Sequence, residues 1–202
     1  YGLDYYAEFT RKFLDTLGVS QCIVAGNSLG GGVAWNFAYH NPVRTAGLIL
    51  FDASGYPRKG ESGSLGFRLA ALPGLNYLLL VVTPKSLVRK SLEQSYGNPA
   101  LVSNELVDRY HSLIIAEGNR MATLSIFKNA FRPDTIRIQR IKAPTLIIWG
   151  KQDNLISFEN AFRFGKDIRG SKVEVLEGVG HVPMEEVPGK SAELILNFLG
   201  HK

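Results

Sequence analysis

Ser28, Asp153 and His181 are residues of the three types that together carry out nucleophilic acyl transfer. A serine hydroxyl is a poor nucleophile until a base removes its proton, and a histidine serves as that base when a carboxylate orients its ring. The three residues stand in the order serine, aspartate, histidine, and the segment between Asp153 and His181 has room for one helix and one strand. Their types and order predict a serine nucleophile with an acid and a base.

The sequence around Ser28 indicates a sharp turn between a strand and a helix. The pattern Gly-x-Ser-x-Gly over residues 26–30 follows a short β-branched stretch, residues 21–25, and precedes a helical stretch. Gly26 and Gly30 are expected where strand and helix approach too closely for a side chain. The alternative is an ordinary helix start, in which Ser28 only caps the helix by accepting a backbone hydrogen bond.

Asp153 and His181 each follow a predicted buried strand. Asp153 comes after the apolar run at 145–149, and His181 lies in a glycine-containing loop after the run at 172–176. Loops at the carboxyl ends of parallel strands carry the chemistry of open α/β sheets. Both side chains are therefore expected at the same edge of the sheet as Ser28.

The apolar periodicity predicts an α/β fold with a mostly parallel sheet flanked by helices. The first helix, over 5–17, places Phe9, Phe13, Leu14 and Leu17 on one face, which is expected to cover the core. Strands at 21–25, 46–51, 145–149 and 172–176 alternate with helices that end near His40 or cover about 157–168 and 189–199.

The middle of the chain has a different pattern. A glycine- and serine-rich entry at 60–66 is followed by helical stretches at 75–82, 84–94, 104–116 and 121–130. We therefore predict three parts: 1–54 as the first part of the α/β core, 55–140 as an inserted helical lid, and 141–202 as the second part of the core.

Three motifs in this order resemble the α/β-hydrolase superfamily, in its serine hydrolase and esterase branch. They are the turn at 26–30, the run Ala-Pro-Thr-Leu-Ile-Ile-Trp-Gly-Lys-Gln-Asp that ends at Asp153, and the pair Gly180-His181. The resemblance covers residues 1 to about 54 and 141–202. It implies Ser28 as nucleophile, His181 as base and Asp153 as acid; some members carry the acid after the preceding strand, where this chain has Asp52.

The resemblance also implies an oxyanion hole of two backbone N–H groups, of which Leu29 supplies one. The second lies on a loop well before the nucleophile, whereas only 27 residues precede Ser28. We therefore expect an N-terminally truncated chain that lacks the first strands of the fold. Loss of one oxyanion donor costs about 2.7–4 kcal/mol of transition-state stabilisation, so we expect weak or no activity from the chain alone.

The expected substrate is a small, apolar carboxylic ester. A Gly-Asn-Ser elbow is also similar to that of carbon–carbon bond hydrolases of aromatic degradation, although Val182 replaces the tryptophan that commonly follows their histidine. Non-catalytic ligand receptors with this fold are a third interpretation. The apolar run at 75–82 is expected to line an acyl pocket, contact lipid or pack on the sheet, and Arg120 to meet an anionic substrate or solvent.

Composition excludes several other classes. The hydrophobic content of 45% is typical of a globular domain. The basic residues behind the net charge of +5 are scattered along the chain, which disfavours nucleic-acid binding. No run reaches the length of a transmembrane helix, and a single Cys22, expected to be a buried and inert thiol, is compatible with a cytoplasmic protein. The remaining polar candidates are interpreted as structural or solvated, and no cofactor or metal site is expected: His40, His111, His201, Glu185 and Glu186.

Overall fold

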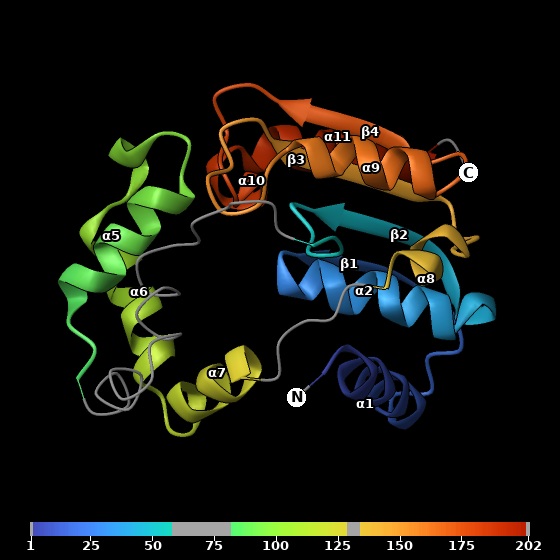
Figure 1. Cartoon of the computed structure of the whole chain (residues 1–202), viewed down its shortest axis with the longest axis horizontal. Coiled ribbons are helices and arrows are strands. Elements are labelled where there is room, and N and C mark those ends of the chain that lie inside the picture. Colours follow the sequence, from blue (N-terminus) through green and yellow to red (C-terminus); the bar gives the residue numbers. More distant parts are fainter. Residues whose placement is uncertain (1, 58–81, 129–133, 201–202) are drawn as a thin grey trace.

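The computed structural model describes residues 2–57, 82–128 and 134–200. Its centre is one parallel sheet, shown in Figure 1, with the strand order β1-β2-β3-β4. The strands are β1 (Cys22–Asn27), β2 (Thr45–Phe51), β3 (Thr145–Gly150) and β4 (Lys172–Leu176). The predicted α/β fold with a parallel sheet is confirmed, and each strand lies close to its expected bounds.

The two central strands are apolar throughout because both of their faces are covered. β2 is buried at every position but one, and β3 at every position. Leu48 and Leu50 face one side of the sheet, whereas Ile49 and Phe51 face the other. The register that pairs Ile49 with Leu146 and Phe51 with Ile148 lines up the carboxyl ends of the two strands.

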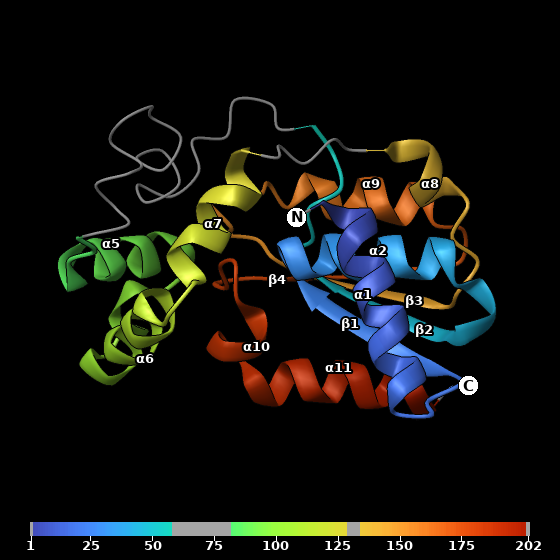
Figure 2. The same cartoon turned by 90° about the horizontal axis from the view of Figure 1, so that it is seen from below.

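Helices cover both faces of the sheet (Figure 2). On one face lie α2 (Leu29–His40), α9 (Glu159–Asp167) and the short α8 (Thr135–Gln139), which bury a cluster around Trp35, Trp149 and Phe164. On the other face lies α11 (Pro188–Gly200), whose Phe198 packs against Ile148. The 3-10 turn η1 (Pro42–Arg44) leads from α2 into β2.

The first helix, α1 (Leu3–Thr16), forms as predicted but does not cover the core with its aromatic face. It contacts α2, and Ala7 is its buried residue. Phe9, Phe13 and Leu17 are each more than half exposed. The prediction for this face was wrong because helical periodicity shows that an apolar face exists but not whether another element covers it.

Three helices form a group at one side of the sheet in both views. They are α5 (Lys85–Ser95), α6 (Asn104–Ile115) and α7 (Asn119–Lys128), with the 3-10 turn η2 (Pro99–Leu101) between the first two. Their cluster around Val88, Leu92 and Val107 includes Val182, next to His181. The helices α5, α6 and α7 agree with the predicted helical stretches at 84–94, 104–116 and 121–130. The run at 60–66 and most of the run at 75–82 lie outside the described residues. The division of the chain into three parts stays a prediction. Among the described helices, none is both long and apolar enough to cross a membrane.

Candidate active site

Ser28 lies at the strained turn that joins β1 to α2. Its φ of 54° and ψ of −119° form a backbone conformation that residues other than glycine rarely adopt. The surrounding backbone holds it there: its N–H donates to the Phe51 carbonyl at 3.0 Å, and its own carbonyl accepts from Ser54 N and Ser54 Oγ, both at 2.9 Å. The Ser28 side chain makes no capping hydrogen bond to α2. The alternative of a simple capping serine is therefore wrong.

The close approach of β1 and α2 accounts for one of the two predicted glycines. A Cβ on Gly26 would lie within 3.0 Å of the Gly30 carbonyl, and one on Gly31 within 3.0 Å of Ala53. A Cβ on Gly30 would meet no atom within 4 Å. The prediction that a close approach requires glycine at position 30 was thus wrong, because the helix turns Gly31, not Gly30, toward the segment after β2.

Asp153 and His181 form a buried pair. His181 Nδ1 lies 2.7 Å from Asp153 Oδ2, and the two residues are 6% and 8% exposed. Asp153 Oδ1 accepts from the backbone N–H groups of Leu155 and Ile156 at 2.7 and 3.0 Å. Because the carboxylate accepts, Nδ1 carries the proton and Nε2 is the acceptor nitrogen of the neutral ring. The pair can therefore orient a base.

The histidine loop is attached to the nucleophile turn through Asn27, the residue before Ser28. Asn27 Nδ2 donates to the His181 carbonyl at 2.9 Å and lies 3.3 Å from the Phe51 carbonyl. The described hydrogen bonds do not include one between the Ser28 hydroxyl and the His181 ring, and catalytic hydrogen bonds are often long before a substrate binds. The bond from Asn27 nevertheless fixes the two loops side by side.

Glu186 attaches the histidine loop to the segment after α5. Its carboxylate accepts from Gly180 N and Gly97 N, both at 2.8 Å, while the His181 N–H donates to the Ser95 carbonyl at 2.7 Å. Gly97 and Gly180 approach so closely that a Cβ on either would come within 3.0 Å of the other's backbone. The interpretation of Glu186 as a solvated residue was wrong, since it bridges two backbone segments.

Glu185 was also expected to be solvated, but it lies at the centre of a polar cluster. It lies on the short helix α10 (Pro183–Glu186) and accepts from Tyr96 Oη at 2.7 Å, Tyr110 Oη at 2.8 Å and Arg109 at 2.9 Å. Burial, followed by the bond to Glu185, raises the pKa of Tyr110 to about 12. Tyr96 and Tyr110 lie 89 and 75 positions before Glu185, so no local sequence pattern connects them with it.

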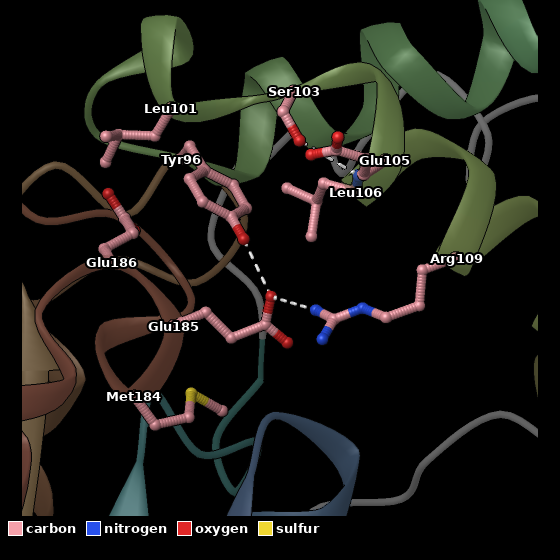
Figure 3. A pocket seen from close by; sticks show the side chains of 9 residues that line it. All are labelled: Tyr96, Leu101, Ser103, Glu105, Leu106, Arg109, Met184, Glu185 and Glu186. Carbon is pink, nitrogen blue, oxygen red and sulfur yellow. Dashed lines mark hydrogen bonds and ion pairs between the residues drawn. The ribbon is translucent and has the colours of Figure 1, made fainter.

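A pocket of about 520 Å³ lies between α10 and the segment that runs from Tyr96 into α6, as Figure 3 shows. Arg109 and Glu185 point toward one another across it, and Met184 forms part of its wall. Ser28, Asp153 and His181 do not line it. Its lining residues are Tyr96, Leu101, Ser103, Glu105, Leu106, Arg109, Met184, Glu185 and Glu186.

Asp52, the alternative acid, follows β2 and is fully buried beside the pair. One carboxylate oxygen of Asp52, one carboxylate oxygen of Asp153 and one ring nitrogen of His181 all lie within 4.8 Å of one another. His181 Nδ1 is hydrogen-bonded to Asp153 and not to Asp52. Since the facing atoms of His181 and Asp153 already bond to each other, this cluster has the character of a hydrogen-bonded acid and base and not of a metal site.

The N–H of Leu29 lies in the first turn of α2, where backbone donors have no acceptor within the helix. The helix dipole adds partial positive charge at this end. These two properties allow the Leu29 N–H to hold a developing oxyanion. Within the described ranges we assign no second donor to this position.

The other candidate residues of the sequence analysis lie away from Ser28, Asp153 and His181. His40 is the last residue of α2, and its Nε2 lies 3.3 Å from Asp4 Oδ1. His111 Nε2 lies 2.9 Å from the Thr83 carbonyl oxygen. Cys22 is half-buried instead of buried, because β1 is an end strand of the described sheet, and this partial burial raises the pKa of its thiol. Arg120 lies near the start of α7, and His201 is outside the described residues.

Comparison with known proteins gives a consistent family. The family model for the alpha/beta hydrolase fold matches residues 1–188. Monoacylglycerol lipase abhd6-B of Xenopus laevis is 28% identical over 217 residues, covering 98% of this chain and 62% of that protein. Monoacylglycerol lipase ABHD6 of Mus musculus is 31% identical over 188 residues, covering 86% of this chain and 53% of that protein. The chain thus spans 62% of the length of the first curated relatives that it matches.

Solved structures show the same fold. A bacterial membrane phospholipase A, described as a virulence factor, has a TM-score of 0.82 and 25% identity, covering 100% of this chain and 64% of that chain. The meta-cleavage product hydrolase CumD of Pseudomonas fluorescens IP01 has a TM-score of 0.81 and 20% identity, covering 100% of this chain and 72% of that chain. The second likeness concerns the fold alone.

Proposed function

The chain belongs to the α/β hydrolase fold family, and on that premise we propose that it is a serine hydrolase that cleaves carboxylic esters. One observation carries the proposal: the buried bond of 2.7 Å between His181 Nδ1 and Asp153 Oδ2, in a loop that Asn27 attaches to the strained turn of Ser28. A buried, oriented imidazole beside a half-buried serine turn is the arrangement that activates a hydroxyl for acyl transfer.

In the proposed mechanism, Ser28 Oγ attacks the ester carbonyl carbon while His181 Nε2 takes the hydroxyl proton. Asp153 holds the imidazolium that forms and remains ionised. The Leu29 N–H stabilises the oxyanion of the tetrahedral intermediate. The intermediate collapses as His181 returns the proton to the alkoxide leaving group, which departs as the alcohol and leaves an acyl group on Ser28.

Deacylation repeats these steps with water as the nucleophile. His181 removes a proton from the water, hydroxide adds to the acyl carbon, and Ser28 leaves with the proton from His181. The products are one alcohol and one carboxylic acid, so no redox partner is required. The strained φ of Ser28 is consistent with this role, because such strain persists only where the structure holds it in place.

The substrate class that we propose is an ester with an apolar acyl chain. Two of the relatives are named monoacylglycerol lipases and a solved neighbour is named a phospholipase A, so each of these names denotes hydrolysis of a lipid ester. The sequence leaves three roles open for the apolar run at 75–82, namely an acyl pocket, a lipid contact or packing on the sheet, and the run lies mostly outside the described residues.

The test is hydrolysis of p-nitrophenyl esters of graded acyl length by the full-length protein and its Ser28→Ala variant. Ser54→Ala is the matched control, because Ser54 lies beside the same turn and the Ser28 carbonyl that accepts from its hydroxyl still accepts from the Ser54 N–H in the variant. We expect turnover that Ser28→Ala abolishes and Ser54→Ala retains. Turnover that does not depend on Ser28 in a folded chain would contradict the proposal.

Carbon–carbon bond hydrolysis is the second candidate, favoured by the Gly-Asn-Ser elbow, in which Asn27 precedes Ser28. A vinylogous diketone of the meta-cleavage type is the discriminating substrate. If it is cleaved in a Ser28-dependent manner and no ester is, the second candidate replaces the first. Labelling of Ser28 by a fluorophosphonate, without turnover of either class, would instead favour a ligand-binding protein that retains an activated serine.

A further inference from the structure

Asp52 is a buried carboxyl group that the proposed mechanism does not use. Its side chain is 0% exposed, and its backbone has a φ of 42°, held by a bond of 3.1 Å from its N–H to the Ile148 carbonyl. Oδ1 accepts from the Gly150 N–H at 2.9 Å. Oδ2 is buried and makes no hydrogen bond to any donor in the described structure. An ionised carboxylate with one bare oxygen in such a place is costly.

The neighbours of Asp52 increase that cost. The titratable groups that face it are Asp153, from the loop after β3, and His181 and Glu186, from the histidine loop and α10. Two carboxyl groups this close to one another do not both ionise readily, so one of them holds a proton. Burial, followed by the charge of Asp153, raises the pKa of Asp52 well above its ordinary value.

The hydrogen-bond donors decide which carboxyl group holds the charge. Asp153 accepts from two backbone N–H groups and from His181 Nδ1, which are three donors that stabilise an ionised carboxylate. Asp52 accepts from Gly150 N alone. The charge therefore belongs on Asp153 and the proton on Asp52, whose Oδ2 is the oxygen without a donor.

We propose that Asp52 is a neutral carboxylic acid whose Oδ2 hydroxyl donates a hydrogen bond to the Asp153 carboxylate, making Asp52 a positioning residue for the Asp153 and His181 pair. The hydroxyl satisfies an otherwise unpaired buried oxygen and adds a donor to Asp153. In turnover, this donor keeps Asp153 ionised and oriented while His181 carries its second proton. The effect on turnover rests on the proposed function, but the protonation of Asp52 does not.

The first experiment measures protonation directly. Carbon-13 NMR of the chain with labelled aspartate side chains distinguishes a protonated carboxyl carbon from an ionised one. At neutral pH we expect one aspartate resonance in the protonated position, which disappears in Asp52→Asn. The control Asp108→Asn, at an exposed residue paired with Lys85, leaves that resonance in place. The absence of a protonated aspartate at neutral pH, or its persistence in Asp52→Asn, would overturn the proposal.

The second experiment separates a neutral donor from a charged acid. Asparagine is also neutral and its amide donates, so Asp52→Asn is expected to retain kcat within about threefold, whereas Asp52→Ala lowers kcat about tenfold with KM unchanged. Equal impairment of the two variants would contradict the donor role. If Asp52→Ala does not fold, the NMR comparison of wild type with Asp52→Asn decides. Failure of the proposed function is separate, because it is seen as wild-type turnover that does not require Ser28.

Discussion

The side-chain amide of Asn27 lies 2.9 Å from the carbonyl oxygen of His181, so the residue before the nucleophile holds the backbone of the base. β1 ends at Asn27, and the histidine loop follows β4, which lies at the opposite end of the described sheet. This one bond therefore joins two loops that come from strands on either side of β2 and β3. We therefore expect it to contribute, with the bond from the His181 N–H to the Ser95 carbonyl, to the position of the base relative to Ser28.

Replacing Asn27 by aspartate keeps the size of the side chain but removes the donor. We expect Asn27→Asp to lower kcat about tenfold or more, because an unpaired carboxylate then faces the His181 carbonyl. Steady-state hydrolysis of a short p-nitrophenyl ester measures the effect. Gln21→Glu is the control, since Gln21 also donates to a backbone carbonyl, that of Val43, but at an exposed position. Equal effects of the two changes would show that Asn27 has no special role.

The two hydrogen bonds that Glu186 accepts predict that it contributes to the stability of the fold. Its two carboxylate oxygens accept from Gly97 N and Gly180 N, and a glutamine at this position offers only one acceptor oxygen. One partly buried backbone donor then loses its partner, so Glu186→Gln is expected to lower the free energy of unfolding by about 1–3 kcal/mol. Urea denaturation measures the change.

The control for Glu186 is Glu177→Gln, because Glu177 is 71% exposed on its side chain and pairs with Lys151 on the surface. Such a surface pair contributes about 0–1 kcal/mol. If Glu186→Gln has no larger effect than this control, the bridge between the histidine loop and the segment after α5 does not stabilise the fold.

Much of the site could be predicted from the sequence because local patterns determine it. The turn that carries Ser28 needs a short strand, a small residue at 26 and a helix, all of which lie within a few residues of one another. The place of Asp153 follows from the buried strand before it. Both predictions depend only on where strands of a parallel sheet end.

The rest depends on contacts between distant segments, which no local pattern contains. Glu186 resembles any loop glutamate until Gly97 and Gly180 are known to lie beside it. The buried Oδ2 of Asp52 is visible only when its neighbours are placed. The exposure of Phe9 has the same origin, because amphipathic spacing in α1 shows a face but not its covering.

The glycines of the nucleophile turn are expected to differ in their tolerance to a methyl group. Gly26→Ala places a Cβ within 3.0 Å of the Gly30 carbonyl, so strand and helix must separate, and we expect a loss of about 1–3 kcal/mol of stability. Gly30→Ala meets no atom within 4 Å and is expected to be neutral or to stabilise the helix by up to about 1 kcal/mol. Thermal unfolding followed by circular dichroism compares them. A larger loss at Gly30 would show that the described approach of β1 and α2 is incorrect.

The raised pKa of Asp52 predicts a pH dependence of stability with a defined sign. Below the ordinary aspartate pKa of about 3.9, both folded and unfolded chains carry the proton, and Asp52 has no cost. As the pH rises, the unfolded chain ionises while folded Asp52 stays neutral, so wild type loses up to about 1.4 kcal/mol per pH unit until the folded pKa is reached. Asp52→Asn cannot titrate and does not share this loss. Urea unfolding from about pH 4 upward should therefore show that the stability of the variant relative to wild type increases with pH. A constant difference for Asp52→Asn would mean that Asp52 is ionised in the folded chain.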